Sequence, residues 1–214
     1  MSKYFLLIFK SDLIRQGELD MVNLNLPQET LDKLKWMINN PENTFCFLGF
    51  TLNLITGDLQ DVLQQNVASP QVKDGTMYQL ITELLIKYAS TSKPVKVGKL
   101  VNFKDFSGGY AYENAFHRRV VEPIVKIFGK NPQNLIKTAK LIGGKQIEYG
   151  DCSIEIETFP EISMTIILWT DEELPPTANV LFDESSGKTF NAEDIAWLSD
   201  LTLWRLSLAQ TLMS

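Results

Sequence analysis

The chain has 214 residues, of which 44% are hydrophobic and 21% charged, and its formal net charge is −6. This composition is typical of an ordinary globular protein and excludes a disordered or membrane-embedded chain. The negative charge argues against nucleic-acid binding, because phosphate contacts need clustered Lys and Arg. No Pro/Gly/Ser-rich linker divides the sequence, so we expect one domain over residues 1–214.

Residues 4–16 place apolar side chains at helical spacing, although the segment could also open as a strand. Its apolar run is too short for a spanning helix or a signal peptide, which favours a cytoplasmic protein without membrane contact. Cys46 and Cys152 lie far apart in alternating apolar patterns, which indicates buried free thiols. An iron–sulfur or zinc site made by this chain alone is therefore not expected.

Residues 27–88 predict a helix, a hairpin and a second helix. Residues 27–38 predict a helix with Pro27 in its first turn, and "NNPE" should end it. The short alternating pattern of residues 44–59, with "TGD" as a turn, predicts an antiparallel hairpin. Asp74 and Gly75 open a further helix with one apolar stripe that reaches Tyr88.

Residues 104–119, "KDFSGGYAYENAFHRR", predict a loop, since Gly108 and Gly109 allow backbone conformations that other residues resist. A helix should follow as far as Phe128, and Pro123 must kink it or break it.

The last third of the chain predicts a helix, a meander and a final helix. The helix lies between "NP" at 131–132 and "GG" at 143–144. Residues 145–183 predict an antiparallel meander in which "MTIILW", apolar on both faces, is the central covered strand. Asn191 caps the last helix. The strands fall into two groups separated by helices, which predicts an α+β fold with an antiparallel sheet packed with several helices.

Two quoted segments carry a resemblance to a known family: "GDCSIEIETFPEISMTIILWTDEELPPTANVLFD" and the following "FNAEDIAWL". They resemble the signature of an uncharacterised family of bacterial and archaeal proteins, a domain of unknown function. "KLVNFKDFSGG" matches a second, weaker segment, and the resemblance covers roughly residues 81–198. It is specific at Trp169, Asp171, Glu172, Glu173, Pro175, Leu181, Phe182, Asp183, Glu193 and Asp194.

Some members of that family are fused to iron–sulfur modules or resemble proteins of corrinoid and one-carbon chemistry in anaerobes. The resemblance thus implies an accessory or binding role near such chemistry, although a shared fold assigns no activity. This chain has Leu174 where an aromatic residue is usual, a tight spacing between Trp169 and Asp171, and no cysteine cluster, so cluster chemistry does not transfer.

The acidic segment 168–183, "LWTDEELPPTANVLFD", is the first site candidate. Carboxylates close together bind hard cations or act as acid and base. Asp171, Glu172, Glu173 and Asp183 could meet if the flanking strands are neighbours. The simpler interpretation is a solvated turn, with Asp183 accepting N–H bonds from its own turn.

His117 is the only histidine, which excludes multi-histidine metal sites. With Arg118 and Arg119 it follows the glycine pair and could hold an anion at a helix start, or all three could be surface residues in ordinary salt bridges. Tyr110, Tyr112 and Trp169 could line a pocket for a planar ligand, although such aromatics more often pack in a core.

No sequence motif of a known catalytic class is present. The leading interpretation is therefore a non-catalytic small-molecule-binding or accessory protein, whose pocket would lie between residues 106–119 and 169–176. The alternatives are a hydrolase or transferase that uses a divalent cation held by Asp171, Glu173 and Asp183, and a protein–protein interaction module.

Overall fold

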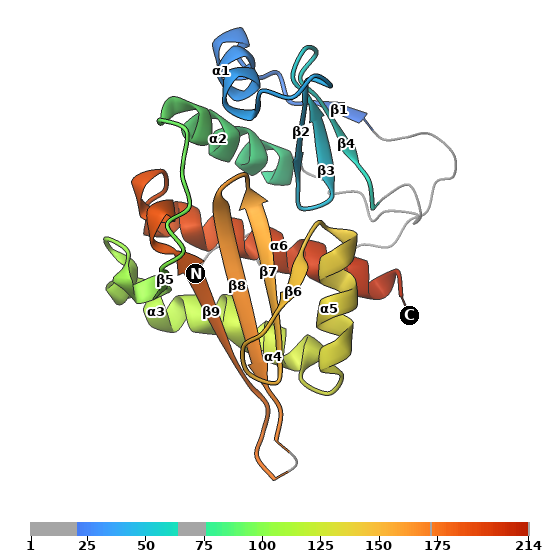
Figure 1. Cartoon of the computed structure of the whole chain (residues 1–214), viewed down its shortest axis with the longest axis vertical. Helices are drawn as coiled ribbons and strands as arrows, with labels where there is room; N and C mark the ends of the chain where they lie inside the picture. The colour runs from blue at the N-terminus through green and yellow to red at the C-terminus, as the bar shows by residue number, and fades with distance from the viewer. Residues whose placement is uncertain (1–20, 64–75, 172, 214) are drawn as a thin grey trace. The chain divides into compact units, whose positions relative to one another are not determined.

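The computed structural model describes residues 21–63, 76–171 and 173–213, and they divide into two compact units (Figure 1). Unit 1 comprises the described residues up to Cys46 and Phe50–Ser90, and unit 2 comprises Phe47–Gly49 and the chain from Thr91 onward. Both units combine helices with an antiparallel sheet, so the predicted α+β class is confirmed. Residues 4–16 lie outside the described part of the chain.

Unit 1 contains a four-stranded sheet in the order β1-β4-β3-β2 and two helices that contact each other. Its elements are β1 (Met21–Asn23), α1 (Gln28–Ile38), β2 (Thr44–Phe47), β3 (Phe50–Asn53), β4 (Asp58–Asp61) and α2 (Thr76–Ser90). The alternating pattern of residues 44–59 did predict the antiparallel β3–β4 pairing, in which Leu52 lies opposite Leu59.

Unit 2 contains a five-stranded antiparallel sheet in the order β5-β9-β8-β7-β6. Its strands are β5 (Leu100–Asn102), β6 (Lys145–Ile147), β7 (Cys152–Phe159), β8 (Ile162–Trp169) and β9 (Thr177–Asp183). The predicted meander is confirmed, and β8 is central and buried along all but its last residue.

The helices of unit 2 lie mainly on one face of this sheet (Figure 1). They are α3 (Gly109–Phe116), α4 (Glu122–Phe128), α5 (Pro132–Leu141) and α6 (Ala192–Thr211), with short helical turns η2 (Phe103–Asp105), η3 (His117–Val121) and η4 (Glu184–Lys188). Asn191 caps α6 as predicted, because its side chain accepts from the Asp194 N–H while the Asp194 carboxylate accepts from the Asn191 N–H. No helix of the described ranges is long and apolar enough to cross a membrane.

The segment 104–119 is not the predicted loop. It becomes helical at Gly109 and stays helical to Phe128, with η3 as a π-helical turn in the middle. In that turn the Glu122 N–H bonds to the His117 carbonyl, five residues back. Pro123 has no N–H and would clash in a regular helix, so the π turn takes the place of the expected break.

A buried arginine holds the turn at residues 48–49 within unit 2. Both turn residues have positive φ, 47° at Leu48 and 75° at Gly49. Arg205 of α6 is 0% exposed, and its Nε donates to the Leu48 carbonyl at 2.8 Å and its Nη2 to the Gly49 carbonyl at 3.3 Å. These bonds satisfy turn carbonyls that burial would otherwise leave without donors.

Candidate functional site

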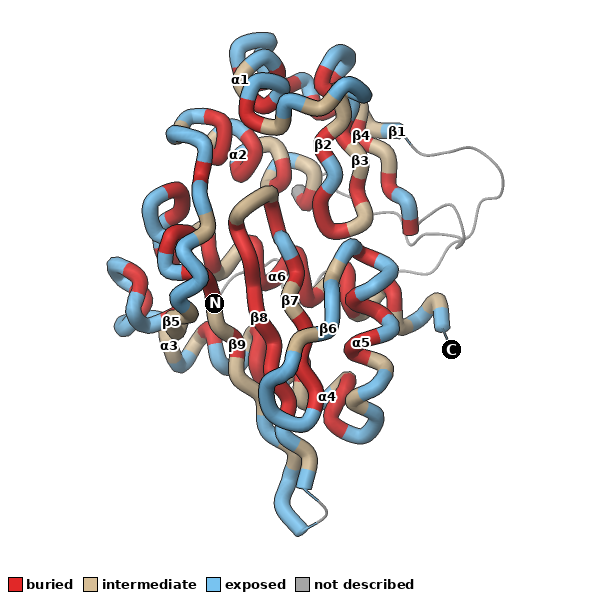
Figure 2. Tube along the Cα trace, in the orientation of Figure 1, coloured by how far each residue is buried: buried red, intermediate tan, exposed pale blue. Residues whose placement is uncertain are grey.

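Residues 170–176 of the acidic segment form the turn of the β8–β9 hairpin, beyond the last paired residues Trp169 and Thr177. Trp169, the last residue of β8, and this turn are here called the arm (residues 169–176), and Asp171 and residues 173–175 are exposed (Figure 2). The Asp171 carboxylate accepts the Glu173 N–H at 2.7 Å, which closes a local turn. The arm also exposes apolar surface, since Leu174 is 67% and Trp169 40% exposed. Glu172 lies outside the described residues.

The base of the arm is supported from both sides. The Asp151 N–H donates to the Leu168 carbonyl at 3.1 Å, and the Asp151 carboxylate accepts the Thr170 N–H at 2.7 Å. On the other side Gly129 packs so closely against Pro176 that a Cβ on it would lie 2.8 Å from the proline ring. The arm therefore leaves the sheet in a defined direction and presents its tip to solvent (Figure 2).

Asp183 lies at the far end of β9 from the arm. The seven residues of β9 span roughly 20 Å at about 3.4 Å per residue, so Asp183 does not meet Asp171 or Glu173. The three carboxylates proposed for a divalent cation are thus not brought together. No group of three or more His, Cys, Asp or Glu in the described ranges could hold a metal ion.

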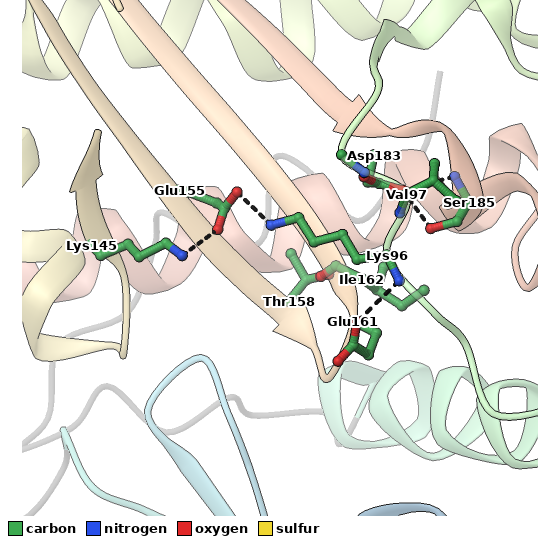
Figure 3. Close-up of polar contacts among 10 residues, drawn as sticks. Lys96, Val97, Lys145, Glu155, Thr158, Glu161, Ile162, Asp183 and Ser185 are labelled. Atoms are coloured by element: carbon green, nitrogen blue, oxygen red, sulfur yellow. Dashed lines mark hydrogen bonds and ion pairs between the residues drawn. The ribbon is translucent and has the colours of Figure 1, made fainter. Parts of the chain in front are cut away.

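Asp183 instead organises its own neighbourhood (Figure 3). Its buried carboxylate accepts the N–H groups of Val97 at 3.1 Å, Gly98 at 2.6 Å and Ser185 at 3.0 Å, and the Ser185 hydroxyl at 2.5 Å. Burial by itself raises the pKa of Asp183, but these hydrogen bonds outweigh it and hold the pKa below the ordinary value. The sequence indicated the bond within the turn, but not those from residues 97 and 98.

Gly108 caps α3 and Gly109 is its first residue, and both are required by the local backbone. Gly108 has a φ of 86°, in the left-handed region that favours glycine. A Cβ on Gly109 would lie 2.1 Å from the Phe103 carbonyl oxygen, so only glycine fits. Both glycines are explained by the backbone, without a ligand.

The other predicted residues of this segment lie on the exposed surface of the helical run. Tyr110 and Tyr112 are 84% and 65% exposed, so they neither pack in the core nor enclose a pocket. His117 and Arg118 are exposed within the π turn and do not stand at a helix start. The His117 Nδ1 lies 3.3 Å from the Glu122 carboxylate, a pairing that the five-residue spacing of a π turn allows.

The expected pocket between residues 106–119 and the arm does not form from these residues. Gly109, at the start of α3, packs on η2, which follows β5, and β5 pairs with the Asp183 end of β9. The arm leaves from the opposite end of that strand. The candidate residues are consequently spread along unit 2.

A second polar cluster, which the sequence did not indicate, surrounds Glu155 of β7 (Figure 3). The Glu155 carboxylate accepts a hydrogen bond from Lys96 Nζ at 2.5 Å and lies 2.9 Å from Lys145 Nζ. Burial alone would raise the pKa of Glu155, yet the two lysines hold it below its ordinary value. The alternation of "SIEIE" placed Glu155 on the polar face of β7, but its partners depend on strand register and on a distant segment.

The comparisons with known proteins agree with the sequence resemblance at the level of the family. No curated protein and no solved structure matches the chain. The model of one family, described as "Domain of unknown function (DUF3786)", matches residues 59–204, which is more than half of the chain. The chain therefore belongs to the DUF3786 family.

Proposed function

We propose that this protein is a non-catalytic accessory protein that docks to a partner protein through the arm. The observation that carries the proposal is that the supported β8–β9 hairpin extends past the rest of the sheet (Figure 1), with Leu174 67% exposed in its turn and Trp169 40% exposed at the end of β8. Large apolar side chains on a defined projection fit a pocket on a partner, where an aromatic or aliphatic anchor contributes much of the binding energy.

The arm also specifies the charge of that partner. Asp171 and Glu173 are exposed beside the apolar anchors. Carboxylates at the rim of an interface favour a partner with Lys or Arg around its apolar pocket, and they act mainly on the association rate. Association should therefore slow as the salt concentration rises.

The family resemblance supplies the proposed setting, an accessory role near anaerobic one-carbon or corrinoid chemistry. A partner from that chemistry would itself carry the corrinoid or the iron–sulfur cluster. The divalent-cation hydrolase is not favoured, because β9 separates Asp183 from the acidic tip.

Native mass spectrometry of the protein purified anaerobically from its source tests the proposal. We expect a complex with a second chain, and a visible absorption spectrum shows whether that chain holds a corrinoid or a cluster. Leu174→Ser should reduce recovery of the complex at least about tenfold, as expected for loss of an apolar anchor.

Leu141→Ser is the matched control, since Leu141 is 46% exposed on α5 and lies away from the arm. It should leave recovery of the complex unchanged. Recovery of the wild-type protein only as a free monomer, or equal recovery of the complex with both variants, would refute docking through the arm.

A further inference from the structure

Two buried hydroxyl groups on the polar face of β8 have no hydrogen-bond partner among the described residues. They belong to Ser163 and Thr165, which are both 0% exposed. Other buried hydroxyls of the same sheet do find acceptors, since Ser153 donates to the Ile147 carbonyl and Thr158 to the Ile162 carbonyl. A buried hydroxyl without a partner is costly and calls for a bound group.

The register of the sheet places these hydroxyls beside the lysine cluster. Thr165 lies directly opposite Glu155, and Ser163 lies opposite Glu157. Cross-strand pairs share one face of a sheet, so both hydroxyls lie on the same face as Glu155. Figure 3 shows Lys96 and Lys145 reaching Glu155.

This site has more donors than acceptors. Each ammonium group carries three N–H donors, and in the described structure Lys96 and Lys145 share the single carboxylate of Glu155. Glu157, exposed at the rim, acts on Lys145 only through its charge. An acceptor that takes hydrogen bonds from the two hydroxyls and from the ammonium groups would complete the site.

Lys96 belongs to residues 94–98, here called the strap. The strap is held by its own backbone: the Lys96 N–H donates to Glu161 at 3.0 Å, and the next two N–H groups donate to Asp183. The Lys96 side chain is therefore not needed to hold the strap.

We propose that Ser163, Thr165, Lys96 and Lys145 form a binding site for a small organic carboxylate. In this site the two hydroxyls and the ammonium groups donate to the carboxylate oxygens of the ligand. This site is separate from the arm and goes beyond the docking function.

Titration of the full-length, ¹⁵N-labelled protein with sodium acetate, at constant ionic strength set by sodium chloride, tests the proposal. We expect saturable shifts of the amides of Lys96, Ser163 and Thr165, with half-saturation below about 10 mM. The Ser163→Ala/Thr165→Val double variant and Lys96→Met should each bind acetate at least about tenfold more weakly. Thr177→Val, which removes an exposed hydroxyl of β9, is the matched control and should bind as the wild type does.

The stability of the double variant to urea provides a second test. Without acetate, the double variant should be at least as stable to urea as the wild type, because it removes two hydroxyls that lack partners. A clear loss of stability would mean that the hydroxyls are already bonded within the protein and would overturn the site. Three other results would also overturn the site: no saturable shift of these amides up to about 100 mM acetate, acetate binding by the double variant equal to that of the wild type, or a response to inorganic phosphate equal to the response to acetate. Leu174→Ser should bind acetate normally, so failure of docking and failure of this site are distinguishable.

Discussion

Replacing Asp183 by alanine removes the acceptor of four hydrogen bonds. Two of the donors, the N–H and hydroxyl of Ser185, are buried, and each loses about 1–1.5 kcal/mol without an acceptor. The Val97 and Gly98 N–H groups belong to exposed residues and can bond to water, so they add little. We therefore expect Asp183→Ala to lower the free energy of unfolding by about 3 kcal/mol.

Urea unfolding at pH 7 measures this loss as a lower midpoint at an unchanged slope. Glu173→Ala is the control and should change the free energy of unfolding by less than about 0.5 kcal/mol, the usual range for an exposed residue. A loss below about 1 kcal/mol for Asp183→Ala, or equal losses for the two variants, would refute the structural role of this carboxylate.

The same carboxylate makes stability depend on pH. The pKa of Asp183 in the folded protein lies below the ordinary value, so the unfolded chain binds the proton first as the pH falls. Its contribution is fully present above the unfolded pKa of about 3.9 and is lost as the pH falls through the folded pKa. The stability difference between wild type and Asp183→Asn should stay constant from about pH 7 to pH 5 and shrink below about pH 4. If the stability difference between wild type and Asp183→Asn grew as the pH fell, the pKa of Asp183 would be raised in the folded protein, and this prediction would be wrong.

Three further predictions concern packing and reactivity. Gly109→Ala should lower the free energy of unfolding in urea by more than about 3 kcal/mol, because the new Cβ would clash with the Phe103 carbonyl oxygen. Gly98→Ala, where the Cβ would meet open space but the backbone has a positive φ, should lower it by only about 1–2 kcal/mol. Arg205→Met should cost about 3 kcal/mol, since two turn carbonyls lose their donor, and a loss below 1 kcal/mol would contradict that role. The sequence prediction of two buried thiols is wrong for Cys46, which is exposed. Iodoacetamide should therefore label Cys46 in the native protein well before Cys152, because burial raises the pKa of the Cys152 thiol. Mass spectrometry measures both labelling rates, and equal rates would contradict the burial of Cys152.

The sequence correctly predicted those helices and strands that are determined by residues close together along the chain. Alternation along "CSIEIET" predicted β7, and the apolar run "MTIILW" predicted the covered β8. Asn191 predicted the start of α6. The loop prediction for residues 104–119 was wrong, because a glycine pair indicates flexibility in a sequence, whereas Gly109 is required by close packing against the nearby Phe103 carbonyl and Gly108 by its positive φ. The π turn also has no simple sequence pattern, although Pro123 marked the place where a regular helix could not continue.

The candidate site was harder to predict, because it depends on which ends of strands meet. The seven residues of "TANVLFD" already imply a strand of about 20 Å, and this length separates Asp183 from Asp171 and Glu173. The cluster around Glu155 joins Lys96 to a residue 59 positions away, a pairing that only strand register and the course of the strap determine.

The Arg205 guanidinium lies 157 positions along the chain from the Leu48 carbonyl that it binds. During synthesis the turn at residues 48–49 emerges long before α6, so for most of translation its carbonyls have no arginine donor. Loop closure over such a distance is slow, and contacts of this range set the pace of folding. We therefore expect a ribosome-stalled chain ending before Arg205 to leave this turn unprotected from hydrogen exchange, and final ordering of the region to occur only after the last helix is released.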